Sequence, residues 1–413
     1  MSNMEDACIE NKYIVDGILI SIVLFSELCF NGIPLFITPI LFLARIIFCK
    51  RIKVDNSIFW LVIMMIYTTL LGSVVPHNTE DFSILYNLAV FLNLIFICIL
   101  ISRYSTVRQI FEILKITIIF STLLSGIYIM SHEYKVIISR LPDYMKGRCG
   151  YRIGVNMGIN PNNIAWLFGM LALFSIYFFI IEKKWKMLLI FFFQLSIIFF
   201  TGSKNGILMA FIPIFYYGIK SIKKLNLKIV IIILISMIVL WNAIQNIPIL
   251  YTLVGERMDQ FLFTLGVKQN LSSVNTDVDS TLKRVIMIKK ANQMFMKKPI
   301  LGWGIGAFAR YSGYGYYCHN NYMELLVSGG IVGFIIYYGY IGIKAFKSCF
   351  FYKNEYKDLL YILIISIFIL DMGTVNFYSR IPFYFRTIVM FIISTKIRKE
   401  NKTKYQYLKL QNT

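Results

Sequence analysis

Long uninterrupted runs of apolar residues are the feature that most limits how this chain can fold. Windows such as Phe82–Ile101 and Asn163–Ile181 hold no charged residue over the roughly 17 to 25 residues that a helix needs to cross the hydrocarbon core of a membrane. Only 15% of the 413 residues are charged, against roughly a quarter in an ordinary soluble domain. A soluble globular fold is therefore excluded, and the bilayer must act as the solvent for most of the chain.

The apolar windows predict an all-α polytopic membrane protein with about 12 transmembrane helices. Several windows are shorter than a typical span, so we expect their helices to extend into flanking polar residues. No remaining stretch is long enough for a typical separate domain, so we expect residues 1–413 to form a single transmembrane unit. The windows are Tyr13–Phe30, Ile33–Phe48, Ser57–Val75, Phe82–Ile101, Ile110–Met130, Asn163–Ile181, Met187–Phe200, Gly206–Ile219, Ile229–Ile247, Tyr322–Ile343, Leu359–Met372 and Phe383–Ile393.

The distribution of Lys and Arg predicts the orientation of these spans. Basic loops such as Lys50–Lys53 and Glu182–Lys186 alternate with loops that hold few basic residues, such as Pro76–Asp81 and Gly373–Ser379. Cytoplasmic loops collect Lys and Arg, so the alternation and the even span number place both termini in the cytoplasm. The formal net charge of +21 follows largely from this rule and does not indicate nucleic-acid binding. We expect no cleavable signal sequence.

Two predicted external segments, 131–162 and 248–321, differ from the other external loops because they are long and basic. Long loops are translocated largely regardless of charge, so their basicity needs another explanation, such as an anionic ligand near the outer leaflet. Within the second segment, residues 281–298 have the pattern of an amphipathic helix on the membrane surface, where lysines would meet lipid headgroups.

Histidine is the side chain best suited to proton transfer near neutral pH, and the sequence holds three: His77, His132 and His319. All three fall on the predicted external side, and we interpret the first two as ordinary loop or helix-end residues. His319 precedes a predicted helix, whose positive dipole end would keep the imidazole neutral. Asn321 can cap that helix and Glu324 can complete a pair like a capping box. Spacing alone does not decide whether His319 is a structural cap or a general base.

Other motifs indicate neither a metal nor a cofactor. Residues 302–307 formally fit a dinucleotide fingerprint, but they lack a βαβ context and lie in a predicted external loop, so we interpret them as a tight glycine turn. The seven cysteines show no metal-binding spacing. Cys149 and Cys318 alone fall in predicted external loops, where oxidation is permitted, but a disulfide between them is not favoured. Asp277 and Asp279 lie in a polar stretch that does not resemble a metal site.

The residues after His319 extend it into a longer motif. His319 and Asn320 are followed by nine residues, then Gly330, two further residues and Gly333. This spacing resembles the H-(N/S/Q)-x9-G-x-x-G signature of the O-antigen ligase and O-antigen polymerase superfamily. The resemblance covers about residues 200–342 by motif, and the whole chain by its predicted spans with a long external loop between spans nine and ten.

Upstream features follow the order of the same family. The segment with Pro299, Gly302 and Gly304 is similar to the proline-then-glycine-rich segment of the family. An arginine, here Arg284, precedes that segment, and a short external turn of the T-G-S-basic type, here ending in Lys204, comes earlier still. The family usually has arginine in this turn. Lysine neutralises a phosphate as a point charge but cannot form the planar bidentate fork.

The resemblance implies glycan transfer from an undecaprenyl-diphosphate-linked oligosaccharide at the external face of the bacterial inner membrane. His319 would be the general base that takes the proton of the acceptor hydroxyl. Lys204 and Arg284, with Arg148 or Arg152, would bind the diphosphate and stabilise the leaving group. No metal or cofactor is implied. The implied partners are the lipid-linked oligosaccharide, the bilayer, and flippase and chain-length regulator proteins.

An aromatic-rich external surface is expected beside His319. Tyrosine rings can stack on sugar rings, and they are also typical of the membrane interface, so either role suits them. The residues concerned are Trp303, Tyr311, Tyr314, Tyr316 and Tyr317.

We favour a polymerase that joins repeat units of O-antigen or capsule over a ligase that moves finished glycan to another acceptor. A polymerase must admit a second lipid-linked diphosphate, and the basic segment Lys135–Arg152 would bind it. A flippase for the same lipid-linked sugars is less favoured, because transporters usually show ionisable residues at mid-membrane or repeated halves. The candidates for such a role in this chain lie mostly near helix ends: Asp16, Glu27, Arg45, Asp371 and Arg386.

Overall fold

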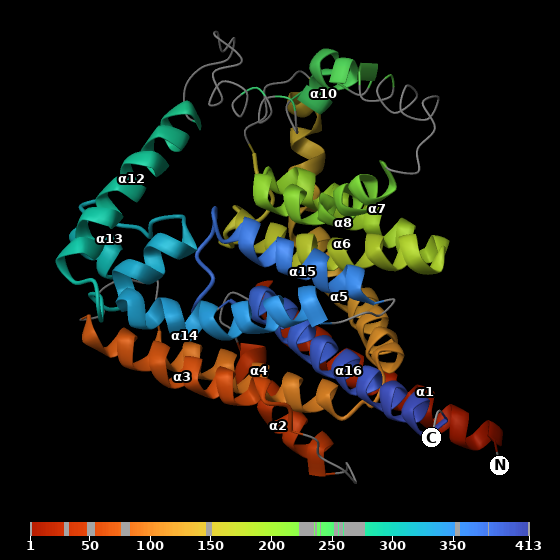
Figure 1. Ribbon diagram of the computed structural model, residues 1–413. Coiled ribbons are helices and arrows are strands. Elements are labelled where there is room, and N and C mark those ends of the chain that lie inside the picture. Colours follow the sequence, from red (N-terminus) through yellow and green to blue (C-terminus); the bar gives the residue numbers. More distant parts are fainter. Residues whose placement is uncertain are drawn as a thin grey trace. The chain divides into compact units, whose positions relative to one another are not determined.

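The structure is a computed structural model (Figure 1) that describes residues 2–28, 33–47, 54–75, 83–145, 151–222, 277–351, 356–378 and 380–411, with a few positions between 235 and 259. All regular secondary structure in these residues is helical, which confirms the predicted all-α class. The chain divides into unit 1, which comprises Met1–Ser121 and Arg284–Thr413, and unit 2, Thr122–Lys283.

Unit 1 holds the helices from both ends of the chain. Helix α3 packs against α4 and α14, and α16 packs against α4 and α15 (Figure 1). Two helices, α5 and α12, cross the boundary between the units. The elements are α1 (Ser2–Phe25), η1 (Ser26–Leu28), α2 (Ile33–Ile47), α3 (Ser57–Val74), α4 (Ile84–Ser102), the first part of α5 (Val107–Met145), most of α12 (Asp277–Lys297), α13 (Ala307–Tyr311), α14 (Asn321–Phe351), α15 (Lys357–Leu370) and α16 (Ile381–Gln411).

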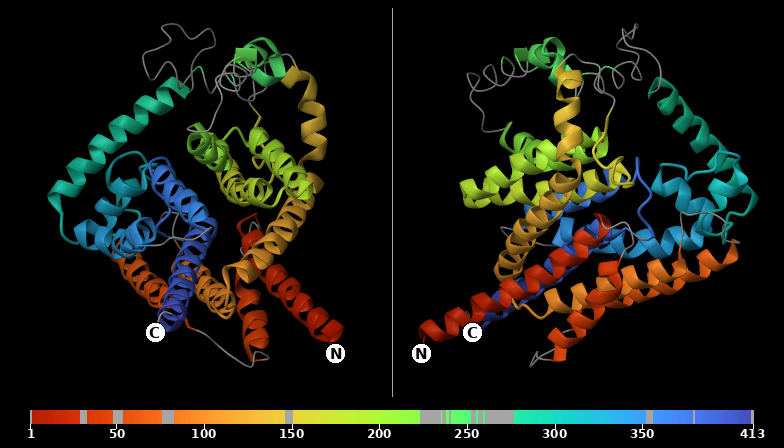
Figure 2. Two further views of the ribbon diagram at one scale, coloured as in Figure 1. Left: turned by 45° about the vertical axis from the view of Figure 1, so that its right-hand side comes forward. Right: turned by 180° about the vertical axis from the view of Figure 1, so that it is seen from behind.

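Unit 2 is built around α6 (Pro161–Glu182), which packs against both α7 (Trp185–Thr201) and α8 (Lys204–Ile222). The three helices lie side by side in both views of Figure 2. Most of α6 is buried, and its Gly169 lies so close to Gly206 of α8 that an added Cβ would come within 3.0 Å of the Gly206 carbonyl oxygen. The short α10 (Pro248–Leu250) also belongs to this unit.

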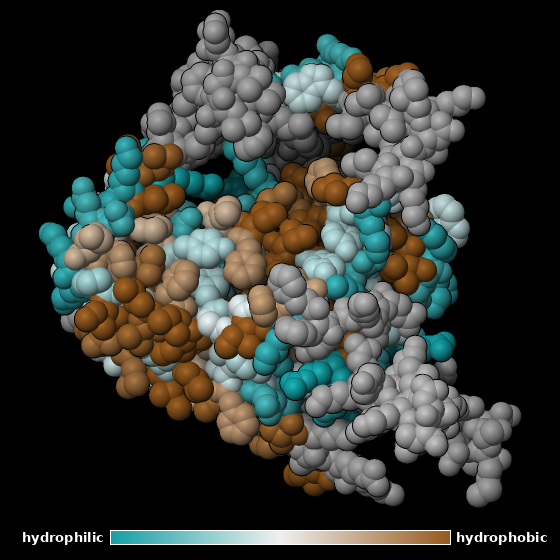
Figure 3. Space-filling model, viewed as in Figure 1, coloured by the Kyte–Doolittle hydropathy of each residue, from teal (hydrophilic) through white to brown (hydrophobic). Residues whose placement is uncertain are grey.

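Five helices in the described part of the chain are long and apolar enough to cross a membrane: α3, α4, α5, α6 and α14. A helix lies at every predicted window except Ile229–Ile247, of which the structure describes only part; the described positions there are helical except Ile247. The α3 helix shows the surface that a lipid-facing helix requires, because Phe59, Ile63 and Leu70 on one face are at least half exposed. Figure 3 shows broad apolar areas, in brown, around α3 and α14. The number of about 12 spans and the external loops stay predictions.

The two predicted long loops contain more helix than the sequence indicated. Helix α5 continues through Ser131 to Met145, so the first half of segment 131–162 is helical. In segment 248–321, α12 covers the predicted surface helix. The packed face of α12 consists of Met287, Ala291 and Met294, whereas the apolar Val285 and Ile286 are exposed.

Helix α14 breaks at Gly330, whose φ is 60° and ψ is −160°. The break exposes backbone groups, and the segment after α12 bonds to them. The N–H groups of Ile331 and Val332 donate to the carbonyls of Pro299 (2.8 Å) and Ile300 (3.2 Å). In return, the N–H groups of Trp303 and Gly304 donate to the carbonyls of Val327 and Ser328, both at 2.8 Å. The proline-glycine segment and the histidine-glycine motif therefore meet at this break.

Glycine is required where these two segments approach each other. Gly302 has a φ of 70°, and a Cβ on it would lie 2.5 Å from the Ser328 carbonyl carbon. Further along α14, Gly333 makes room for Tyr67 of α3, whose hydroxyl would lie 2.7 Å from an added Cβ. The same hydroxyl donates to the Gly329 carbonyl at 3.0 Å. Gly302 and Gly333 therefore permit α14 to pack closely against the proline-glycine segment and against α3.

We expect Gly330→Ala to destabilise the protein by more than about 2 kcal/mol. The added Cβ would lie 2.3 Å from the Ile300 carbonyl oxygen, at a φ of 60° that disfavours any L side chain. The measurement is the thermal unfolding midpoint of the purified protein in detergent.

The matched control is Gly342→Ala in the same helix, where an added Cβ meets nothing within 4 Å. This control should be neutral or stabilising, by up to about 1 kcal/mol, because alanine favours helix. Equal midpoints for the two variants would contradict the account of the helix break.

Candidate functional site

His319 lies one residue before the cap of α14. The side-chain oxygen of Asn320 accepts a hydrogen bond from the Met323 N–H at 3.0 Å, which is the contact of an N-cap residue. The Asn320 carbonyl also accepts from the Glu324 N–H at 2.9 Å. The prediction that Asn321 is the cap is therefore wrong by one residue, and His319 itself does not cap the helix.

The backbone of His319 is in the left-handed conformation, with a φ of 56°, which a non-glycine residue adopts at a cost of about 1 to 3 kcal/mol. Hydrogen bonds on both sides hold it there. The Cys318 N–H donates to the buried carboxylate of Glu324 at 2.7 Å, and the Asn320 amide donates to the Met372 carbonyl at 3.1 Å. Glu324 thus fixes the chain before His319, instead of forming the predicted capping-box pair.

A buried polar cluster ties the first turn of α14 to the turn after α15. The Asn321 N–H donates to the Asp371 carbonyl at 2.8 Å, and its side-chain amide donates to the Asp371 carboxylate at 3.0 Å. The Tyr338 hydroxyl donates to the same carboxylate at 2.6 Å. The Asn321 side-chain oxygen accepts from the Asn376 N–H at 2.6 Å. This role of Asp371 and Asn376 was not predicted from the sequence, where their polarity in a short loop between apolar helices marks them without indicating which residues they contact.

The pKa of His319 is lowered to about 4, first by its burial and second by the positive charge of Arg284. The imidazole is therefore neutral at physiological pH. From the sequence we expected a neutral imidazole for another reason, the positive end of the helix dipole.

Arg284 belongs to the same unit as His319 because α12 packs on the loop that carries the histidine. Met287, Ala291 and Met294 of α12 form a buried cluster that includes Cys318, next to His319 in the chain. The Trp303 indole N–H also donates to the Met294 carbonyl at 2.9 Å. Arg284 itself is exposed. Unit 1 therefore presents a neutral imidazole together with an accessible guanidinium.

Unit 2 brings together two of the other predicted cations. Lys204 is the first residue of α8, directly after the turn in which Gly202 has a φ of 61°. The Arg152 guanidinium donates to the Thr201 carbonyl of that turn at 2.6 Å and to the Asn162 side-chain oxygen at 3.1 Å. Arg148, the remaining predicted cation, lies outside the described residues.

The buried Glu133 of α5 anchors the chain around Arg152. Its carboxylate accepts from the Tyr151 hydroxyl and from the Gly154 N–H at 3.0 Å. The Ile153 N–H donates to the Phe200 carbonyl at 3.1 Å, next to the turn with Lys204. The position of Arg152 is therefore fixed by contacts on either side of it.

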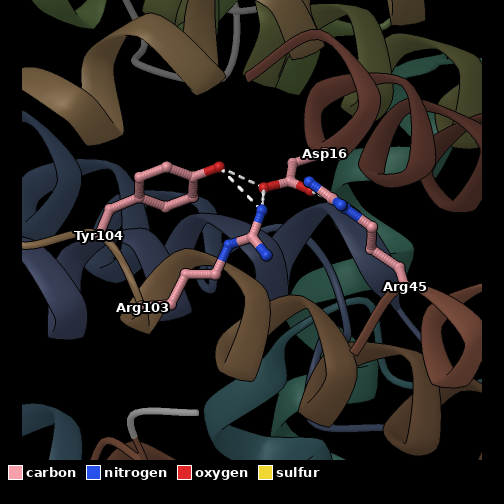
Figure 4. Close-up of polar contacts among 4 residues, drawn as sticks. All are labelled: Asp16, Arg45, Arg103 and Tyr104. Atoms are coloured by element: carbon pink, nitrogen blue, oxygen red, sulfur yellow. Dashed lines mark hydrogen bonds and ion pairs between the residues drawn. The ribbon is translucent and has the colours of Figure 1, made fainter. Parts of the chain in front are cut away.

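A further charged cluster in unit 1 has a structural explanation (Figure 4). Asp16 of α1 is fully buried, and its carboxylate accepts from Arg45 of α2 at 2.9 Å, from Arg103 and from Tyr104. Removing one partner from such a buried cluster would leave an uncompensated charge. Asp16 and Arg45, two of the residues that a transporter would use, are thus engaged in joining helices.

No group of three or more His, Cys, Asp or Glu side chains is close enough to hold a metal ion in the described part of the chain. Cys318 is a buried free thiol, and Cys149 lies outside the described residues.

Comparison with protein families gives one match. Residues 187–338 match the family model described as O-antigen ligase, and this region contains Lys204, Arg284, His319 and both glycines of the histidine motif. The match confirms the resemblance to the O-antigen polymerase and ligase superfamily. Neither the curated proteins nor the solved structures gave a match.

We expect His319 to titrate near pH 4, well below the ordinary value of about 6.5. Carbon-13-labelled histidine in a His77→Asn/His132→Asn protein leaves His319 as the single reporter, so its ring signal gives the pKa directly by NMR. Arg284→Gln should raise this pKa, because a neutral neighbour no longer disfavours the imidazolium.

Lys289→Gln, which removes a charge from the same helix, should leave the pKa close to 4. The account of the site fails if His319 titrates at its ordinary pH in the parent protein, or if both variants shift it equally.

Proposed function

We propose that this chain, a membrane protein of the O-antigen polymerase and ligase superfamily, joins undecaprenyl-diphosphate-linked repeat units of a bacterial surface polysaccharide. The reaction would take place at the external face of the inner membrane, with both termini of the chain in the cytoplasm. The observation that carries this proposal is His319, which is neutral, is held in a strained backbone conformation, and lies close enough to Arg284 for that positive charge to help lower its pKa. Both residues lie within the region that matches the family.

In the proposed step, a hydroxyl oxygen of the acceptor sugar attacks the anomeric carbon of the donor sugar. A new glycosidic bond forms as the bond between that carbon and the diphosphate oxygen breaks. His319 takes the proton of the attacking hydroxyl, a role that only the neutral imidazole can perform. The strained backbone supports this role, because strain of this kind clusters at sites where a side chain must be held in a particular place.

Arg284 is the proposed partner of the leaving diphosphate. Its guanidinium can form two parallel hydrogen bonds to phosphate oxygens and stabilise the charge that develops as the diphosphate departs. The negative diphosphate would also offset the positive charge of Arg284, one of the two causes of the low pKa of His319. Donor binding would in this way raise the pKa of His319 and make the imidazole a stronger base when the acceptor arrives.

The cations of unit 2 are proposed to bind a lipid-linked diphosphate as well. Lys204 and Arg152 converge on one turn, and the preceding segment from Lys135 is basic. A polymerase needs two anionic sites because both its donor and its acceptor carry a diphosphate, whereas a ligase with a different acceptor needs one. This is why we prefer the polymerase.

Purified protein in nanodiscs, given a single lipid-linked repeat unit and no other acceptor, should produce a ladder of products spaced by one repeat. Gel electrophoresis of labelled substrate shows the ladder directly. If the substrate stays at one unit until a different acceptor glycan is added, the polymerase proposal is wrong and the protein is a ligase.

Variants of Lys204 test whether this residue binds the diphosphate. Lys204→Ala should reduce the ladder strongly, whereas Lys204→Arg should retain it, because arginine keeps the charge and adds the bidentate fork. Lys186→Ala, which removes an exposed lysine elsewhere in unit 2, should have no effect. A ladder that is equally intense in all three variants would remove Lys204 from the site.

A further inference from the structure

An uncharged segment rich in aromatic rings leads from α13 to His319. Residues 312–318 contain three tyrosines and no acidic or basic side chain. The ring centroids of Tyr314 and Tyr316 are 6.2 Å apart, and those of Tyr316 and His319 are 5.8 Å apart. The Tyr317 ring also contacts the imidazole, with 4.4 Å between the two ring centroids. The candidate base is therefore in contact with two tyrosine rings.

One part of this segment is anchored and another part is open. The Tyr314 ring stacks on the ring of Phe308, with 6.1 Å between the centroids, and Phe308 is fully buried. The Gly315 N–H donates to the Ala309 carbonyl at 3.2 Å. Tyr316, in contrast, is 39% exposed. The core holds the segment in place, and packing within the unit does not account for the open ring of Tyr316.

Two glycines shape the segment. Gly313 has a φ of 88° and Gly315 a φ of 76°, a conformation that glycine adopts without strain. A Cβ on either residue would meet no atom within 4 Å. These glycines therefore do not accommodate a close neighbour. They turn the backbone and leave open space along the segment.

We propose that Tyr316 forms a stacking subsite that holds a neutral sugar ring of the acceptor glycan against His319. The absence of charge in residues 312–318 favours a neutral ligand over the diphosphate, which needs Arg284. A pyranose presents an apolar face of C–H groups, which packs on the face of a phenol ring, and hydroxyls, which can bond to the phenol oxygen.

The position of Tyr316 identifies the acceptor as the source of this sugar. The acceptor hydroxyl must come within hydrogen-bond reach of His319 to lose its proton, and Tyr316 is in contact with that imidazole. A sugar positioned for proton transfer would therefore have Tyr316 beside it. This subsite depends on the proposed function, because it assumes that His319 takes a proton from a sugar hydroxyl.

The test uses two soluble probes and calorimetry of the full-length protein in nanodiscs. The first probe is the oligosaccharide repeat released from its lipid and diphosphate by mild acid, and the second is inorganic pyrophosphate. Tyr316→Leu should weaken binding of the oligosaccharide by about five- to tenfold and leave pyrophosphate binding unchanged. Tyr316→Phe, which keeps the ring face, should bind the oligosaccharide nearly as the parent protein does.

Tyr134→Leu is the control, because it removes a 44% exposed tyrosine from α5. It should change neither affinity. If Tyr316→Leu binds the oligosaccharide as Tyr134→Leu does, or loses both probes equally, the subsite is wrong. If the parent protein produces a ladder of polymer but Tyr316→Leu binds the oligosaccharide unchanged, the subsite alone is overturned. If oligosaccharide binding depends on Tyr316 but the parent protein transfers no glycan, only the proposed function is overturned.

Discussion

The place of His319 depends on the buried hydrogen bonds between Asn321 and the turn after α15. Asn321 uses its backbone N–H and both side-chain polar atoms in these contacts. Each buried polar group that lost its partner would cost about 1 to 3 kcal/mol, so the start of α14 is held firmly against Asp371. His319 lies two residues before Asn321, so these contacts also fix its position. Its strained backbone persists because the surrounding contacts determine it.

A second constraint acts farther along α14. The break at Gly330 is stabilised by the segment that begins at Pro299. The backbone of α14, which starts beside His319, is therefore hydrogen-bonded to the segment that follows α12. This bonding explains why histidine and glycines occur in one motif, although they do different things. The glycines permit close contact between backbones, whereas the histidine carries the chemistry. Arg284 reaches the histidine loop because α12 packs on the same core.

Much of the helical architecture could be predicted from the sequence, because long apolar windows have few alternatives to helix. The windows did not reveal that α5 continues through Ser131 to Met145, since that extension is polar. His319 was found through local spacing and the family motif. Asp371 was not assigned to the site, because its contact with Asn321 joins residues 50 positions apart and no local pattern indicates such a contact. The low pKa of His319 has a similar origin, since it depends on burial and on Arg284 of another helix.

The central claim is that His319 acts as the base for glycan transfer, and the rate of transfer by His319→Ala tests it most directly. The account predicts a loss of about 100- to 10,000-fold in membrane vesicles supplied with the lipid-linked repeat unit. The amount of protein in the membrane and its thermal unfolding midpoint should remain close to those of the parent, and His132→Ala, at an exposed histidine of α5, should transfer normally. A well-expressed His319→Ala protein that transfers glycan at nearly the parental rate would contradict the account and leave His319 with a structural role only.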